Sequence, residues 1–222
     1  MKILAFEPKV EKENVITKLK GREKRLGRLF SYELVYLGYY FFIFNFIARK
    51  DQKEPAKAII AADTVDGSPV FFKQDVEELD KAKEIEVEDK SVLKVRCKEE
   101  EAYEKASDEL RKRLLKVTMW RKVGLNFSLL EKRLIYFPYY VGYYLAYKKD
   151  SIIKSLGNVI ISAKIPKVER ENKEIRFEVV NALSGELGNV YGRAAVMRGI
   201  IMDGIDSQWD KDEFDFKFFK EK

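Results

Sequence analysis

Two dense runs of apolar and aromatic residues dominate the hydrophobic pattern of the chain. The first extends from Leu34 to Ala48, the second follows Leu134, and each ends in charged residues. A run that is rich in Tyr and Phe and apolar without alternation is typical of a strand buried on both faces. The first run is also shorter than the roughly 20 residues that a membrane-spanning helix needs. We therefore predict two long strands and no membrane span.

The two runs match each other without a gap. Glu33-Leu-Val-Tyr-Leu-Gly-Tyr-Tyr aligns with Arg133-Leu-Ile-Tyr-Phe-Pro-Tyr-Tyr, and the segment from Ile59 to Gly67 corresponds to the segment from Phe177 to Gly185. Both downstream segments read as β runs closed by a hairpin-turn signal, Asp-Gly in one and Ser-Gly in the other. An internal duplication explains this similarity, and chance likeness between two aromatic strands is the alternative.

Helical patterns precede both runs. The first, Thr17 to Arg28, is basic, and the second extends from Glu99 to about Lys122. In the second, apolar residues recur at spacings of three and four, which predicts an amphipathic helix with one core-facing stripe. The stripe consists of Tyr103, Ala106, Leu110, Leu114 and Val117. The capping-box pattern of Asp75-Val-Glu-Glu78 predicts a further helix that begins near Val76.

The second half of the chain carries additional elements. Alternating residues from Val159 to Ile165, before Pro166, predict an added strand. The segment from Ala194 to Ile205 is mildly apolar and predicts a short helix. Phe214, Phe216 and Phe218 alternate with charged residues, which suits a final strand, with a partner-docking tail as the alternative.

These patterns predict an α+β fold: two related antiparallel β units in pseudo-tandem repeat, each preceded by a helix and joined by a charged helical connector. We expect a first helix and tyrosine-rich β unit in residues 1–73 and the connector in 74–124. A second, longer β unit with a C-terminal aromatic and acidic segment is expected in 125–222.

Composition supports a globular protein with a heavily ionised surface. Of the 222 residues, 46% are hydrophobic and 36% are charged, too apolar a balance for a disordered chain. Abundant Lys and Glu without any His is typical of heat-adapted proteins. Cys97 is the single cysteine, so no intramolecular disulfide can form, and the N-terminal residues lack a signal-peptide pattern. We expect a cytoplasmic protein.

The absence of histidine excludes several chemistries. Ser-His-Asp and Cys-His catalysis, and zinc sites that need imidazole, are impossible. No phosphate-binding loop or dinucleotide fingerprint is present, so we predict no catalytic residue, resident metal or cofactor. Carboxylates remain as candidate ligands for a hard cation: Asp63 with Asp66, and Asp203 with Asp206 and Asp210. Turn geometry and a solvated helix face explain these two groups equally well.

Basic residues gather in the two helical segments and are candidate contacts for nucleic acid. Such density can neutralise phosphates, and the formal net charge of the chain is +6. The duplicated tyrosines could stack on bases, although tyrosines in an apolar run are more often core. The candidate nucleic-acid-binding residues are Lys20, Arg22, Lys24, Arg25, Arg28, Arg111, Arg113, Lys116, Arg121 and Lys122.

The run Asn181-Ala-Leu-Ser-Gly-Glu186, with Tyr136-Phe-Pro-Tyr-Tyr140 before it, resembles a strand-turn pattern of small PepSY-like β units. In those units a run of the type Asp-Ala-x-Thr/Ser-Gly-Glu ends a strand, and Asn181 stands here where Asp is usual. The resemblance covers under a tenth of the chain. It implies a regulatory or interaction module rather than an enzyme.

The sequence therefore favours a non-enzymatic binding or scaffold protein whose specific role it does not identify. Candidate partners are DNA or RNA, an acidic protein, or a second copy of the chain. Three alternatives stay open: a carboxylate- and magnesium-dependent enzyme of nuclease-like type, a protein-partner module with no nucleic-acid role, and a membrane-surface protein anchored by exposed aromatics.

Overall fold

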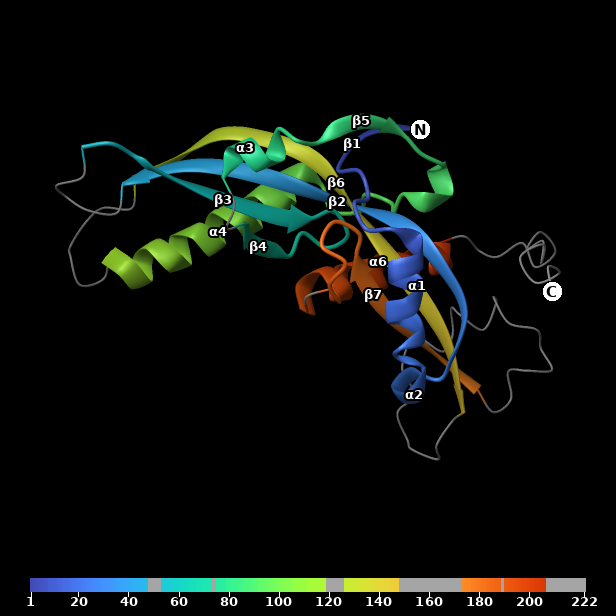
Figure 1. Cartoon of the computed structure of the whole chain (residues 1–222). Helices are drawn as coiled ribbons and strands as arrows, with labels where there is room; N and C mark the ends of the chain where they lie inside the picture. Colours follow the sequence, from blue (N-terminus) through green and yellow to red (C-terminus); the bar gives the residue numbers. More distant parts are fainter. Residues whose placement is uncertain (48–52, 73–74, 119–125, 148–172, 189, 207–222) are drawn as a thin grey trace.

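The computed structural model describes residues 1–47, 53–72, 75–118, 126–147, 173–188 and 190–206. Helices cover a mixed sheet of seven strands, an α+β architecture (Figure 1). The strands are β1 (Lys2–Ala5), β2 (Arg28–Ile47), β3 (Ala56–Asp63), β4 (Pro69–Phe72), β5 (Lys83–Glu86), β6 (Asn126–Tyr147) and β7 (Lys173–Asn181). The helices are α1 (Lys12–Lys20), α2 (Glu23–Leu26), α3 (Val76–Leu79), α4 (Glu99–Thr118) and α6 (Val190–Asp206), with a 3-10 turn η1 (Asp89–Ser91).

The strands β2 and β6 form the centre of the sheet. They pair antiparallel from Arg28 opposite Leu145 to Ile47 opposite Asn126, with two irregularities on the way. Every residue of β2 from Val35 to Phe44 is buried, because aromatic and β-branched side chains fill both faces of the strand. The predicted long strands are therefore confirmed.

Two shorter strands flank this pair at opposite ends. The strand β3 pairs with residues 39–46 of β2, and β7 pairs with residues 139–147 of β6. We call residues 39–47 with β3 and β4 the first arm, and residues 139–147 with β7 the second arm. The arms point to opposite sides of the molecule (Figure 1). The sheet order is β4-β3-β2-β6-β1-β5, and β7 lies on the other edge of β6 from β2.

The same turn follows β3 and β7. Asp63 lies opposite Tyr39, and Asn181 lies opposite Tyr139. In both turns the side-chain oxygen accepts backbone N–H groups two and three residues further on, from Val65 and Asp66 in one turn and from Leu183 and Ser184 in the other. The turns close at Gly67 (φ 72°) and Gly185 (φ 69°), in the left-handed region that favours glycine.

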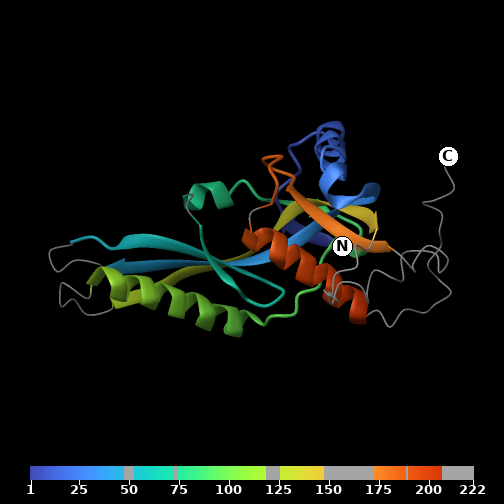
Figure 2. The ribbon, with the colours of Figure 1, turned by 90° about the horizontal axis from the view of Figure 1, so that it is seen from below.

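Each arm is covered on one face by the helix that precedes the other long strand. The helix α4, which leads into β6, packs the stripe from Tyr103 to Leu114 on Tyr40, Phe42, Phe44 and Ile60 of the first arm, and the side chain of Val117 lies outside the described part. The helix α1, which leads into β2, packs Val15 and Leu19 on Tyr140, Tyr144 and Val180 of the second arm. Figure 2 shows α4 along one arm and α1 beside the other. Each helix therefore covers the arm built on the long strand that it does not precede.

The opposite face of the sheet carries one continuous core, to which α3 and α6 contribute Leu79, Ala195 and Val196. Near its middle the hydroxyl groups of Tyr39 and Tyr139 lie 3.2 Å apart in a buried hydrogen bond. Burial raises the pKa of both tyrosines. These tyrosines therefore belong to the core, and a role as an exposed platform for bases does not apply to them.

Other predicted elements agree in part with the structure. The helix α3 begins at Val76 as predicted, but Asp75 makes no side-chain capping hydrogen bond. The connector contains α4, and it also contains β5, which pairs with β1. The predicted strands at 159–165 and 214–218 lie outside the described residues. In the ranges that the structure covers, no helix is long and apolar enough to cross a membrane.

The packing of α1 and α4 on the arms predicts which leucine-to-alanine substitutions destabilise the fold. Leu19 in α1 and Leu110 in α4 are fully buried, whereas Leu130 is about half exposed. We expect Leu19→Ala and Leu110→Ala each to lower the free energy of unfolding in urea by about 2–5 kcal/mol, because each removes packing between a helix and an arm. Leu130→Ala is the matched control, with an expected loss below about 0.5 kcal/mol. Equal losses in all three variants would contradict the packing described.

Candidate nucleic-acid interface

The predicted basic residues form two separate groups in the structure. Lys20 ends α1, Arg22 directly precedes α2, Lys24 and Arg25 lie in α2, and Arg28 begins β2. Arg111, Arg113 and Lys116 lie in the second half of α4, and Arg121 and Lys122 lie outside the described residues. The two groups stand at opposite ends of the molecule (Figure 1). The described basic residues therefore do not form one continuous surface.

The α4 group is engaged with its own surroundings. Arg111 pairs with Asp108 at 2.6 Å and Arg113 pairs with Glu109 at 3.1 Å, both within the helix. The two guanidinium groups also lie over the rings of Phe127 and Phe71, at 5.5 and 3.7 Å from their centroids. Helical ion pairs and cation–π contacts of this kind stabilise α4 on the first arm.

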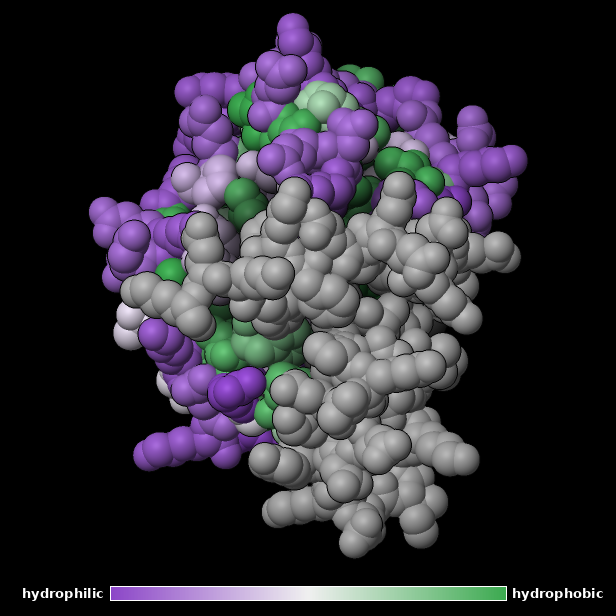
Figure 3. Space-filling model, turned by 90° about the vertical axis from the view of Figure 1, so that its right-hand side faces the viewer, coloured by the Kyte–Doolittle hydropathy of each residue, from purple (hydrophilic) through white to green (hydrophobic). Residues whose placement is uncertain are grey.

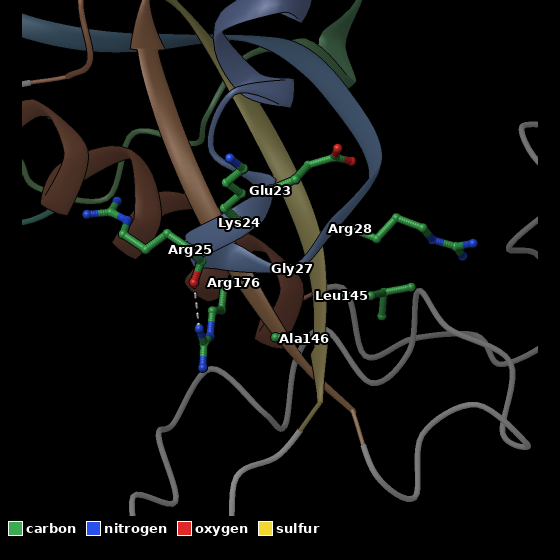
Figure 4. Close-up of a pocket in the computed structure, with 8 residues that line it drawn as sticks. All are labelled: Glu23, Lys24, Arg25, Gly27, Arg28, Leu145, Ala146 and Arg176. Carbon is green, nitrogen blue, oxygen red and sulfur yellow. Dashed lines mark hydrogen bonds between the residues drawn. The ribbon is translucent and has the colours of Figure 1, made fainter.

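Three residues of the first group, Lys24, Arg25 and Arg28, line a cavity of about 630 Å³ at the end of the second arm. Arg176 of β7 joins them, and Glu23 carries the one carboxylate among the lining residues that the structure describes. The remaining lining residues are Gly27, Leu145 and Ala146. Figure 4 shows the charged side chains fanning outward from the ribbon in different directions rather than converging on one point. Figure 3 views the molecule from this side, where hydrophilic residues predominate on the described surface around smaller apolar patches.

A tight turn brings α2 against β6 to form this cavity. Gly27 has φ 103°, and a Cβ atom there would lie 2.1 Å from the carbonyl oxygen of Leu145. Only glycine therefore fits without a shift of the backbone. Glu23 stabilises the turn by accepting the Leu29 N–H at 2.9 Å, and Arg176 donates to the Arg25 carbonyl at 3.0 Å.

A buried carboxylate holds the basic residues to the sheet. Glu178 of β7 is 1% exposed, and its oxygens lie 3.1 Å from Arg22, 2.9 Å from Arg25 and 3.3 Å from Arg193. An unpaired carboxylate would be very costly to bury, so the three arginines are what allow it there. Burial raises the pKa of the neighbouring Tyr144 to about 12, and the charge of Glu178 adds to the shift.

At the matching place, the described residues of the first arm are apolar. Its register puts Ile60 where the second arm has Glu178, Ala58 where it has Arg176, and Phe46 where it has Ala146. Leu110 and Leu114 of α4 cover that apolar surface. The helix α1 is shorter than α4, 9 residues against 20, and ends before the corresponding surface. The same arrangement of strands therefore does not require charged residues at this place.

The candidate cation ligands are occupied by other partners. Arg198 of α6 lies 3.0 Å from the Asp66 carboxylate and 3.7 Å from that of Asp63. Asp203 pairs with Arg96 at 2.7 Å. Asp210 and the side chain of Asp206 lie outside the described part of the chain. No group of three or more metal-ligating side chains occurs among the residues that the structure covers.

Sequence reasoning missed Arg176 and Glu178. A signal for Glu178 was present, since it interrupts the apolar run of Phe177-Glu-Val-Val, and a charge inside a buried strand needs partners. Two of its partners, Arg22 and Arg25, lie 156 and 153 residues away in the sequence, and the third, Arg193, comes from α6. The pattern along the chain therefore contains the anomaly but not its explanation.

Comparison with family models, with curated proteins and with solved structures finds no match to this chain. The resemblance of the Asn181–Glu186 turn to PepSY-like units therefore stays a likeness of one turn.

The two matching turns predict the effect of replacing Asp63 with asparagine, the residue that begins the other turn. Asp63→Asn keeps the acceptor that Asn181 already provides in the other turn. Burial raises the pKa of Asp63 above its ordinary value of 3.8, so the folded protein binds this proton more tightly than the unfolded chain. Wild-type stability from this group therefore falls as pH rises from 3.8 through the folded-state pKa. We expect the variant, measured by urea unfolding, to gain stability relative to wild type between pH 4 and pH 7.

The opposite result would be informative. If Asp63→Asn lost stability relative to wild type as the pH rose, the attraction between Asp63 and Arg198 would outweigh the burial of the charge.

Proposed function

We propose that this chain is a non-enzymatic binding protein that holds the phosphate backbone of a nucleic acid against the end of its second arm. The observation that carries the proposal is the cavity lined by Lys24, Arg25, Arg28 and Arg176, in a place where the first arm is closed by apolar side chains. A charged surface that the framework does not need is best explained by a charged ligand. The arrangement favours an anion.

The chemistry of these side chains suits a polyanion. Lysine and arginine neutralise phosphates and release condensed counterions, which supplies most of the affinity of sequence-independent binding. The fan of charged groups in Figure 4 suits several phosphates spread over a surface better than one small anion held at a point. The formal net charge of +6 adds a long-range attraction that speeds association.

We also infer that the framework is an internal duplication. Three observations support it: the matching registers of β3 on β2 and β7 on β6, the same side-chain hydrogen bonds in the two turns, and the reciprocal packing of α1 and α4. Leu37 pairs with Phe137 at the position where the two aligned runs face each other. The two predicted β units are then repeats within one sheet, joined through the segment around α3, β5 and α4.

Charge reversal at either end of the molecule tests the proposal. The test variant carries Lys24→Glu and Arg28→Glu, neither of which pairs with a carboxylate in the described structure. The matched control carries Lys112→Glu and Lys116→Glu, exposed residues of α4 that give the same change in net charge at the opposite end. Binding to a fluorescently labelled oligonucleotide is followed by anisotropy over a series of salt concentrations.

We expect the test variant to bind at least about tenfold more weakly than wild type. The slope of its log affinity against log salt concentration should correspond to about two fewer phosphate contacts. The control is expected to stay within about threefold of wild type. Equal losses in the two variants would show that net charge alone drives binding, and wild-type binding that is indifferent to salt would contradict the proposal altogether.

A further inference from the structure

We propose that Glu178 is a positioning residue of the phosphate-binding end: it fixes α2 on the sheet and thereby sets where Lys24 and Arg28 stand. This inference rests on the proposed function and adds to it a residue that does not meet the ligand, since the Glu178 side chain is 1% exposed. It follows from the contacts that hold α2 in place.

The helix α2 cannot hold its position by itself. It consists of 4 residues, and Leu26 is its buried residue. A helix of a single turn is not stable in isolation and depends on contacts with the rest of the protein. One buried leucine gives it little apolar packing, so polar contacts contribute to its position.

Two arginines attach α2 to one oxygen of Glu178. Arg22 donates through Nε at 3.1 Å and Arg25 through Nη2 at 2.9 Å, both to Oε2. Residues three apart lie on the same side of a helix, so this side of α2 faces β7. The other oxygen, Oε1, lies 3.3 Å from Arg193 of α6. Charge-assisted bonds to a buried carboxylate are strong and little screened by salt. They therefore fix both the place of α2 and its rotation about its axis.

The cationic groups of the cavity depend on that placement. Lys24 lies between the two anchoring arginines in the sequence and so on a different side of the turn. Figure 4 shows Lys24 and Arg25 extending from α2 in different directions. Arg28 is separated from α2 by Gly27 alone. A shift or rotation of α2 is therefore expected to displace both Lys24 and Arg28.

The sign of the effect separates positioning from simple electrostatics. A carboxylate repels phosphate, and its removal raises the formal net charge by one unit from +6. Charge alone therefore predicts tighter binding when Glu178 is neutralised. Positioning predicts weaker binding, because side chains that are no longer held must be ordered when the ligand binds.

The test measures anisotropy of a labelled DNA oligonucleotide over a salt series, with urea unfolding of each variant in the same buffer. Glu178→Gln removes the charge and keeps the shape, whereas Arg22→Lys keeps the charge and removes the Nε contact. Val179→Ala is the matched control, because this neighbour in β7 is fully buried in the core on the other face of the sheet.

We expect Glu178→Gln and Arg22→Lys each to bind about threefold or more weakly than wild type, and Val179→Ala to stay within about twofold. The slope of log affinity against log salt concentration for Glu178→Gln should correspond to about one phosphate contact fewer. If Glu178→Gln does not unfold cooperatively, Arg22→Lys decides the test, because Arg22 is 31% exposed and its substitution leaves Glu178 in place.

A double-mutant cycle shows through which residues the effect passes. The same substitutions are placed in the Lys24→Glu, Arg28→Glu background, where we expect them to change the affinity by less than about 1.5-fold. Unchanged or tighter binding in the single variants, an equal loss in Val179→Ala, or the full loss in this background would each overturn the inference and leave the proposed function in place. Absence of wild-type binding would overturn the proposed function, and this inference with it.

Discussion

The antiparallel pairing of β2 with β6 is the interaction on which the rest of the structure depends. It buries two long aromatic strands against each other and sets Leu37 opposite Phe137 near the middle. Each long strand has a second edge that faces away from this pairing. At one end of the pair β3 occupies that edge of β2, and at the other end β7 occupies that edge of β6. The positions of both turns and of both covering helices follow from this arrangement.

The likeness between the two arms makes their differences informative. On the first arm a long helix covers Ile60 and Ala58 with leucines, as expected for a purely structural surface. On the second arm the covering helix stops early, and Glu178 and Arg176 occupy the matching positions. A buried carboxylate with three arginines rarely improves stability over apolar packing. At matching positions the second arm therefore carries a more costly arrangement than the apolar packing of the first arm.

Much of the local structure was predictable from the residues. The aromatic run around Tyr40 predicted a long buried strand, the glycines at 67 and 185 marked the turns, and the stripe through Leu110 predicted α4. The arrangement of these elements was not predictable, because pairing between strands distant in sequence depends on tertiary packing. For the same reason the sequence did not show that the ten candidate basic residues belong to more than one surface. The packing of α1 and α4 on different arms puts the eight described ones at opposite ends, and the cavity described above lies at one of these ends.

Amide hydrogen exchange with and without a saturating DNA duplex tests most directly whether only the end of the second arm contacts nucleic acid. We expect slower exchange in residues 20–28 and 176–178 when the duplex is bound, and unchanged exchange in residues 108–116 of α4. Protection of the α4 residues, or protection spread evenly over both arms, would contradict it.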